Sequence, residues 1–271
     1  MPIKERDVEF EGTTMHCYEG GKGYPVLMIH GSGPGTASAT NWAHVMEPLS
    51  KSYRILAMDM IGYGKSGRKP AKPYFDMDMW VRQAIAALDL LSPKGPVGII
   101  GHSLGGAVAL RTALEVSRVN KLILQGSLGA QKKITLPIAR SWVVPKDEKA
   151  FRHYYKNVIR VRIPLTDEFV KGRMALLRKD GYDKYFNAMF VGNKQRYVDA
   201  SRISPPALRK LKCDVTMIHG ADDACVPFEE GGIELAHLLP QADLFRLADC
   251  GHPCSFEQPQ KFMALAKLAL G

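Results

Sequence analysis

Short runs of consecutive apolar residues recur along the chain, and each run ends in small or polar residues. We predict strands that are buried on both faces, because a half-exposed strand would alternate apolar and polar positions. The runs cover residues 26–31, 54–59, 97–101, 121–126, 214–220 and 242–247. Between them lie stretches of helical periodicity, such as residues 77–91. This alternation predicts an α/β fold with a mostly parallel sheet and helices on both of its faces.

The alternation stops between residues 128 and 212, where no comparable buried run occurs. This interval contains helix-like stretches, and Thr166 is a candidate N-cap followed by two acidic residues. An interruption of this length is too long for a loop within a compact domain. We therefore predict an α/β core formed by residues 1–127 and 213–271, with residues 128–212 inserted as a helical cap.

The composition excludes several classes of protein. Hydrophobic residues make up 46% of the 271 residues, which is typical of a globular chain and not of a disordered one. No apolar run reaches the length of a membrane span, and the N-terminal segment has mixed charge without the apolar region of a secretory signal. The five cysteines are odd in number and suggest no disulfide framework. These features predict a cytoplasmic protein.

One buried run leads directly into a motif that carries chemistry. Residues 101–105 read Gly-His-Ser-Leu-Gly and are followed by a helical pattern, which gives a G-x-S-x-G motif at a strand-to-helix turn. Such a turn exposes the serine hydroxyl, and its glycines let neighbouring backbone pass close by. The backbone N–H groups at the start of the helix can also stabilise negative charge that develops on a substrate during the reaction. Ser103 is therefore the candidate nucleophile.

A serine nucleophile needs a histidine to remove its proton and an acid to orient that histidine. In folds with this motif, the order along the chain is serine, acid, histidine. Two aspartates follow the run at 214–220, and His252 follows the last run. We predict Asp223 as the acid, because it lies three residues after a glycine and precedes a Val-Pro pair; Asp222 is the alternative. His252 is the predicted base.

Acyl transfer also requires an oxyanion hole made of two backbone N–H groups. One comes from the residue after the nucleophile, which is Leu104. The other is expected in the loop at residues 30–35, which reads His-Gly-Ser-Gly-Pro-Gly. We predict Ser32 as this donor, flanked by Gly31 and Gly33, which allow the backbone to approach a ligand.

A metal site is the competing interpretation of the segment at residues 250–254, which reads Cys-Gly-His-Pro-Cys. A structural zinc site would need a second cluster of ligands, and the sequence offers none. We therefore expect neither a metal nor another cofactor.

Together these motifs resemble the α/β-hydrolases that cleave carbon–carbon bonds in the meta-ring-fission products of aromatic compounds. The loop at 30–35 followed by Asn41 and Trp42 is fairly specific for this family, whereas the serine motif and triad are shared by many α/β-hydrolases. The resemblance extends over nearly the whole chain, at residues 30–35, 41–42, 53–66, 101–105, 165–173, 186–190, 220–227 and 250–252.

The resemblance implies a 2-hydroxy-6-oxo-hexa-2,4-dienoate substrate, which is ketonised and then split by water into a 2-hydroxydienoate and a carboxylic acid. It also implies that Asn41 and Arg173 bind the enolate and carboxylate end, Arg173 through its bidentate fork. A solvated cation on the cap is the alternative for Arg173. The resemblance further favours a homodimer or a larger homo-oligomer.

Two positions depart from the family pattern. The family usually has Asn before the nucleophile and Trp after the catalytic histidine, whereas this chain has His102 and Pro253. His102 can still donate a hydrogen bond to a substrate carboxylate, but an indole contact is lost at Pro253. A carboxylesterase or lactonase with the same triad is therefore the alternative activity. A non-catalytic receptor on the same scaffold is a third interpretation, and the intact triad and oxyanion loop oppose it.

The net charge of +10 would ordinarily suggest nucleic acid or an anionic membrane as a partner. The charge is unevenly distributed, however. Residues 128–212 contain 20 Lys and Arg against 7 Asp and Glu, a net charge of +13, and the rest of the chain carries −3. A cationic cap over a cleft favours capture of small anions. We therefore expect a small anionic or ester substrate, and neither nucleic acid nor membrane as a partner.

Overall fold

The fold is built on one eight-stranded sheet, and the computed structural model describes residues 2–159 and 165–271. The strand order is β1-β2-β4-β3-β5-β6-β7-β8. All pairs from β4 to β8 are parallel, and the pairs of β1 with β2 and of β2 with β4 are antiparallel. The strands are β1 (Lys4–Phe10), β2 (Thr13–Gly20), β3 (Pro25–Ile29), β4 (Arg54–Met58), β5 (Val97–His102), β6 (Val119–Gln125), β7 (Asp214–Gly220) and β8 (Ala242–Leu247).

The predicted α/β fold with a mostly parallel sheet is confirmed. Each of the six apolar runs forms a strand, from β3 to β8. The sequence reasoning missed the hairpin of β1 and β2, because β1 is exposed at most positions and so carries no apolar run. This hairpin forms the antiparallel edge of the sheet.

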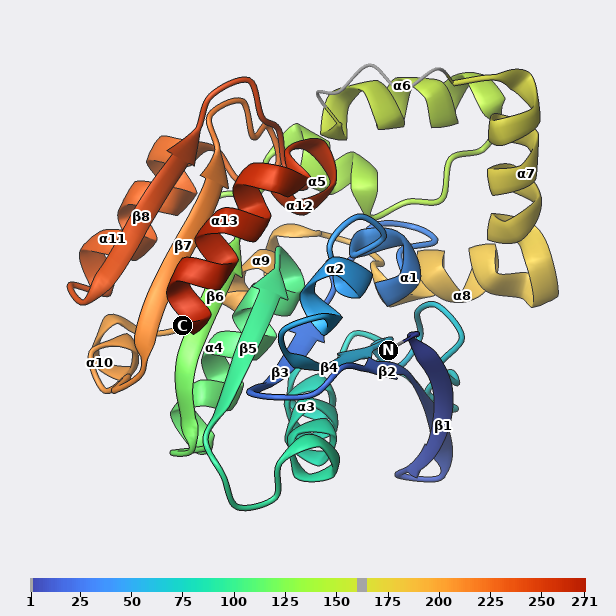
Figure 1. Cartoon of the computed structure of the whole chain (residues 1–271). Coiled ribbons are helices and arrows are strands. Elements are labelled where there is room, and N and C mark those ends of the chain that lie inside the picture. The colour runs from blue at the N-terminus through green and yellow to red at the C-terminus, as the bar shows by residue number, and fades with distance from the viewer. Residues whose placement is uncertain (1, 160–164) are drawn as a thin grey trace.

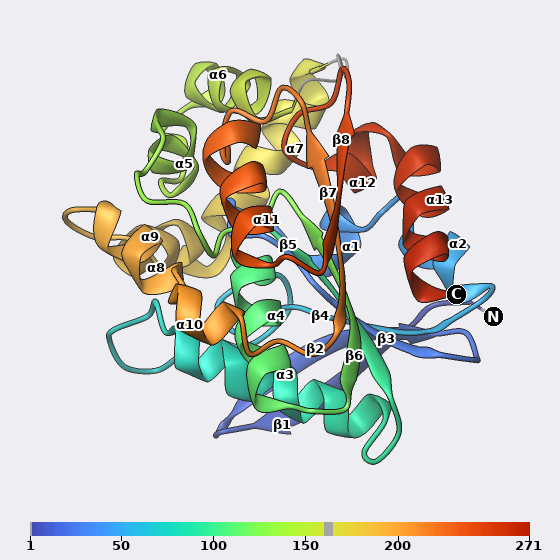
Figure 2. The same ribbon diagram turned by 90° about the vertical axis from the view of Figure 1, so that its left-hand side faces the viewer.

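Two apolar cores cover the two faces of the sheet. Alternate residues of a strand point to opposite faces, so Leu27 and Ile29 of β3 enter one core and Val26 and Met28 enter the other. Figure 2 shows the sheet nearly edge-on, with α3 (Met77–Leu91), α4 (Leu104–Glu115) and α11 (Glu234–Leu238) on one side. On the other side lie α2 (Met46–Ser50), α12 (Cys254–Glu257) and α13 (Pro259–Leu270).

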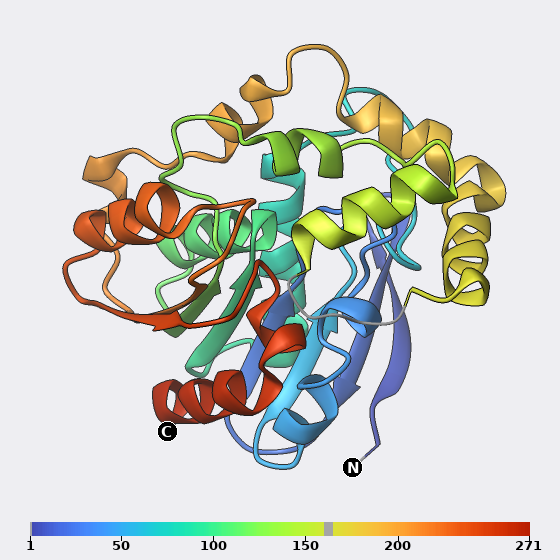
Figure 3. The same cartoon turned by 90° about the horizontal axis from the view of Figure 1, so that it is seen from above.

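The interval between β6 and β7 contains helices and no strand among its described residues. Thr166 caps the longest of these helices, as predicted, because its hydroxyl accepts a hydrogen bond from the backbone N–H of Phe169. Seen from the side and from above, α5 and α6 lie beyond the carboxyl ends of the strands (Figures 1 and 3). The helices are α5 (Leu136–Ser141), α6 (Glu148–Val158), α7 (Asp167–Arg178), α8 (Tyr182–Met189), α9 (Gln195–Ser201) and α10 (Pro205–Leu208).

Two features of this arrangement position the functional site. Loops that follow parallel strands meet at the carboxyl edge of the sheet, so the ends of β3, β5, β7 and β8 bring four distant segments together. From the interval between β6 and β7, α5 and α6 lie above this edge (Figure 1). Among the described residues, no helix has the length and apolar character needed to span a membrane.

Candidate active site

Ser103 occupies a strained turn between β5 and α4. Its backbone has φ 54° and ψ −120°, a conformation that residues other than glycine rarely adopt. The turn is possible because the flanking glycines allow close backbone contacts. A Cβ atom on Gly101 would lie 2.7 Å from the carbonyl oxygen of Gly105, and one on Gly105 would lie 2.6 Å from that of Ile29. The sequence motif thus forms the sharp strand-to-helix turn that its glycines predicted.

Backbone hydrogen bonds hold this turn in place. The N–H of Ser103 donates to the carbonyl of Gln125 at 3.0 Å, and the carbonyl of Ser103 accepts from the N–H groups of Gly106 and Leu128, each at 3.0 Å. Gln125 and Leu128 belong to the end of β6 and the segment after it. The position of the serine is therefore set by the neighbouring strand as well as by its own turn.

Asp223 and His252 meet in the interior. Nδ1 of His252 donates to Oδ2 of Asp223 at 2.8 Å, and both residues are buried. Oδ1 of Asp223 accepts from the backbone N–H groups of Cys225 and Val226, each at 2.9 Å. Burial opposes ionisation of Asp223, but the nearby His252 and His219 outweigh it and hold the pKa of the carboxyl below its usual range. The carboxylate therefore keeps a proton on Nδ1 of His252, which leaves Nε2 free to accept one.

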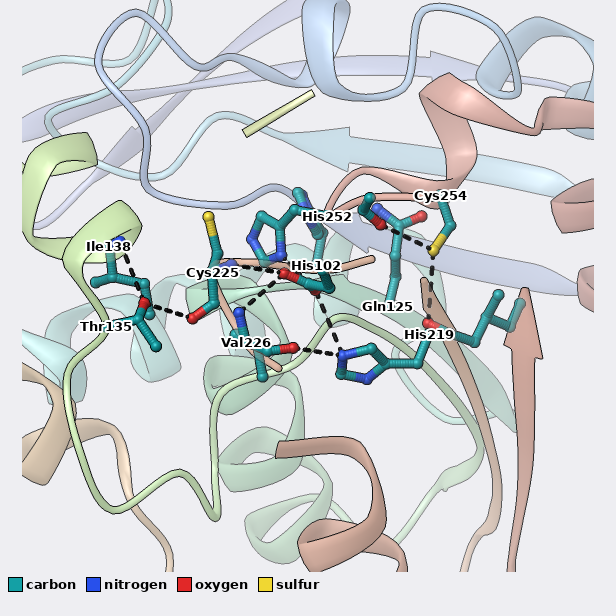
Figure 4. A network of polar contacts seen from close by, with 12 residues as sticks. His102, Gln125, Thr135, Ile138, His219, Cys225, Val226, His252 and Cys254 are labelled. Atoms are coloured by element: carbon teal, nitrogen blue, oxygen red, sulfur yellow. Dashed lines mark hydrogen bonds and ion pairs between the residues drawn. The ribbon is translucent and has the colours of Figure 1, made fainter. Parts of the chain in front are cut away.

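His219 adds a contact to the acid that the sequence reasoning did not predict. Its Nε2 donates to the carbonyl of Val226 at 2.7 Å and lies 3.4 Å from Oδ2 of Asp223 (Figure 4). The signal in the sequence was its spacing, because His219 lies one residue before the end of β7 and four residues before Asp223. Asp222, the alternative acid, has an exposed side chain, so the structure brings Asp223 and not Asp222 to His252.

The predicted oxyanion loop passes close to the nucleophile. A Cβ atom on Gly31 would lie 3.2 Å from Cβ of Ser103. The backbone N–H groups of Ser32 and Leu104 have no hydrogen-bond partner within the described part of the chain. The side chain of Ser32 is held from the cap, since its Oγ accepts from Nε1 of Trp142 at 2.8 Å. Two unpaired backbone donors beside a serine that lines a cavity are what an oxyanion hole requires.

Asn41 connects this loop to His102. Oδ1 of Asn41 accepts from the N–H of Gly31 at 3.3 Å and from Nδ1 of His102 at 2.7 Å. From the sequence we expected His102 to donate a hydrogen bond to a substrate carboxylate. In the structure its Nδ1 donates to Asn41 instead. Burial and the neighbouring His252, whose ring centroid is 4.7 Å away, hold the pKa of His102 well below its usual value. His102 is therefore a neutral ring that braces Asn41 and the oxyanion loop.

Arg173 reaches the same region from α7 in the cap. Its Nη2 donates to the carbonyl of Gly35 at 3.2 Å, and the residue is half-buried. Among the described residues this is the one hydrogen bond of Arg173, and it uses one of the five N–H donors of the guanidinium group. Arg173 is therefore anchored to the loop at residues 30–35 and retains donors for an anion.

A cavity of about 320 Å³ joins these groups. Its walls combine the ends of the strands with aromatic side chains of the cap, among them Trp142, Phe151 and Tyr154. Leu104 and Asp223 lie behind this surface. The other predicted site residues line it: Gly31, Ser32, Gly33, Asn41, His102, Ser103, Arg173 and His252.

The cap residues of the cavity were missed by sequence reasoning. Phe151, Tyr154, Tyr155 and Val158 of α6 all line the cavity. Their spacing of three, four and seven residues places them on one face of a helix, which is the signal that could have found them. The sequence did not show which side of the cap this face would meet.

One group of side chains has the composition of a metal site. Ligand atoms of Asp223, Cys225 and His252 lie within 4.8 Å of one another. Both carboxylate oxygens of Asp223 already accept hydrogen bonds, one of them from His252. Burial and the charge of Asp223 raise the pKa of Cys225 well above its usual value, so this residue remains a thiol. Metal binding here would compete with the histidine–carboxylate pair.

Taken together, the strained serine, the buried histidine–carboxylate pair and the unpaired backbone donors form the site of a serine hydrolase. The family model described as the alpha/beta hydrolase fold matches residues 24–259. This protein is thus an α/β-hydrolase in both sequence and structure.

Individual relatives define a narrower group. The chain is 33% identical over 261 residues to the 2-hydroxymuconate semialdehyde hydrolase of Pseudomonas sp. (strain CF600), with 96% of this chain and 91% of the relative covered. It is 31% identical to the 2-hydroxy-6-oxo-2,4-heptadienoate hydrolase of Pseudomonas putida, over 94% and 91% of the two chains. Among solved structures, a variant of the meta-cleavage product hydrolase CumD from Pseudomonas fluorescens IP01, complexed with acetates, matches with a TM-score of 0.89 and 30% identity over 96% and 95% of the chains. The chain belongs to the family of meta-cleavage product hydrolases.

Proposed function

We propose that this protein hydrolyses a carbon–carbon bond in a 2-hydroxy-6-oxo-hexa-2,4-dienoate produced by fission of an aromatic ring. The observation that carries the proposal is the shared cavity of Ser103, His252 and Arg173. It offers a nucleophile and base together with an anchored cation that retains free donors. A dienoate with a ketone at one end and a carboxylate at the other matches this arrangement.

Each group has a role in this reaction. The dienol is first ketonised, and His252 carries the protons. Ser103 then attacks the C6 carbonyl or assists the attack of water, while the N–H groups of Ser32 and Leu104 hold the oxyanion. Asp223 orients His252 and stabilises its protonated form. Breaking the C5–C6 bond consumes one water and releases a 2-hydroxydienoate and a carboxylic acid.

The names of relatives support the same substrate class, since two of them are hydrolases of a 2-hydroxymuconate semialdehyde and of a 2-hydroxy-6-oxo-2,4-heptadienoate. All five cysteines are free thiols, which is typical of proteins in a reducing compartment and supports a cytoplasmic location. The family resemblance supports assembly as a homodimer or a larger oligomer. We include both in the proposal.

A comparison of two substrates tests this function. We expect kcat/KM for a yellow 2-hydroxy-6-oxo-dienoate to exceed that for p-nitrophenyl acetate by about tenfold or more, because only the dienoate has a carboxylate for Arg173 and hydrogen bonds to charged groups contribute about 1.5–3 kcal/mol. The measurement is the loss of dienoate absorbance beside the release of p-nitrophenol. Arg173→Gln should remove most of the difference and leave ester hydrolysis unchanged. Efficient ester hydrolysis without dienoate cleavage would instead establish a carboxylesterase.

Salt dependence tests the role of the cationic cap. Residues 128–212 carry a net charge of +13, which attracts a small anion toward the cavity beneath them. We expect kcat/KM for the dienoate to fall several-fold between about 10 mM and about 500 mM salt, because ions screen this attraction. Hydrolysis of the neutral p-nitrophenyl acetate is the matched control and should not change. A kcat/KM for the dienoate that stays constant would contradict electrostatic attraction by the cap, and it would not affect the assignment of the catalytic triad.

A further inference from the structure

Three alternate glycines of the loop at residues 30–35 approach three functional groups. A Cβ atom on Gly31 would lie 3.2 Å from Cβ of Ser103. One on Gly33 would lie 2.8 Å from the hydroxyl oxygen of Tyr154, and one on Gly35 would lie 3.3 Å from Nη2 of Arg173. In the order of the loop, the hydroxyl of Tyr154 therefore lies between Ser103 and the guanidinium group of Arg173.

Tyr154 is placed in the cavity by α6. It lines the cavity together with Ser103 and Arg173. Its side chain is half-buried, and its hydroxyl makes no hydrogen bond to residues 2–159 and 165–271, so the hydroxyl can pair with a bound ligand. Burial raises the pKa of Tyr154; Cys225 adds to the increase and Arg173 opposes it. The hydroxyl therefore stays protonated and can donate a hydrogen bond to a bound ligand.

The proposed substrate presents an oxygen that suits this donor. When the C6 carbonyl lies at Ser103 and the C1 carboxylate lies at Arg173, the oxygen on C2 lies between the two ends and next to the carboxylate. This oxygen gains negative charge when the dienol loses its proton during ketonisation. A hydrogen bond to it strengthens as the charge develops, and such a bond increases kcat more than it improves binding.

We propose that the Tyr154 hydroxyl donates a hydrogen bond to the C2 oxygen of the dienoate and stabilises it as an enolate during ketonisation. This assignment rests on the proposed function. Tyr154 gives and receives no proton in this step, and Arg173 holds the adjacent carboxylate. The phenol thus distinguishes a 2-hydroxydienoate from a simple ester, which has no oxygen at that place.

Kinetics of Tyr154→Phe tests the assignment. We expect kcat for the dienoate to fall about 10- to 100-fold, because hydrogen bonds to charged groups contribute about 1.5–3 kcal/mol. Hydrolysis of p-nitrophenyl acetate should stay within about twofold of the wild type, since the triad is unaltered. The inhibition constant of 6-oxo-hexa-2,4-dienoate, which lacks the C2 oxygen, should not change.

The matched control is Tyr74→Phe, which removes a phenol hydroxyl from a residue that does not line the cavity. The ring of Tyr74 packs against Tyr185 with centroids 4.5 Å apart, and we expect both activities to remain near the wild-type values. Unchanged dienoate turnover in Tyr154→Phe would overturn the assignment and leave the proposed function standing. An equal loss of dienoate and ester turnover would also overturn it, because the hydroxyl would then act in the oxyanion hole or in folding. Absence of dienoate cleavage in the wild type would refute the proposed function, and this assignment with it.

Discussion

Ser103→Ala should lower kcat for the dienoate by about a thousandfold or more, and ester hydrolysis by a similar factor. Both reactions need the hydroxyl of Ser103, which lines the cavity together with His252. No described residue hydrogen-bonds to this hydroxyl, so its removal leaves the surrounding contacts intact. The measurement is single-turnover kinetics with both substrates, together with thermal unfolding to show that the variant folds.

Binding provides the control for this variant. The oxyanion donors and Arg173 are unchanged in Ser103→Ala, so the affinity for the dienoate should stay within about threefold of the wild-type KM when chemistry is slow. Undiminished turnover of both substrates would contradict the whole catalytic assignment. Loss of ester hydrolysis alone would show that carbon–carbon cleavage uses water activated by His252 without the serine.

Asp223→Asn should lower kcat for both substrates by about 10⁴-fold with little change in structure, by analogy with the triads of other serine hydrolases. The amide oxygen can keep the hydrogen bonds from the N–H groups of Cys225 and Val226. The amide nitrogen then faces Nδ1 of His252 and donates to it. This places the ring proton on Nε2, where it prevents His252 from accepting the proton of Ser103.

The adjacent aspartate offers a matched control. Asp222 differs from Asp223 by one position and has an exposed side chain. Asp222→Asn should therefore leave kcat within about twofold of the wild type, since surface substitutions seldom have large effects. Steady-state kinetics of the two variants at pH 7 makes the comparison. A larger loss in Asp222→Asn than in Asp223→Asn would reverse the assignment of the acid.

Much of the site follows from local sequence because local backbone geometry imposes it. The turn around Ser103 needs glycines at positions 101 and 105, where a Cβ atom would meet neighbouring backbone, so the motif is visible without a structure. The apolar runs likewise predicted the strands from β3 to β8, because a strand buried on both faces must be apolar throughout. The order of serine, acid and histidine then followed from the known connectivity of such folds.

Other parts of the site depend on contacts between distant segments, which a single sequence does not specify. The indole of Trp142 donates a hydrogen bond to Ser32, which is 110 residues away in the sequence. Asn41 accepts one from Nδ1 of His102, which is 61 residues away. The hairpin of β1 and β2 escaped prediction because β1 is mostly exposed and has no apolar run, and the buried stretch of β2 includes the polar His16.

By itself, the sequence determined the strained serine turn, the order of the triad and a parallel sheet, since each is set by backbone geometry within a few residues or by burial along one strand. Only the tertiary structure decided that Asp223 faces His252, that His102 binds Asn41, and that Tyr154 enters the cavity. The first two outcomes depend on how the strand-end loops of the core meet, and the third depends on how α6 packs over them. Packing between elements is fixed by the shapes of many side chains at once.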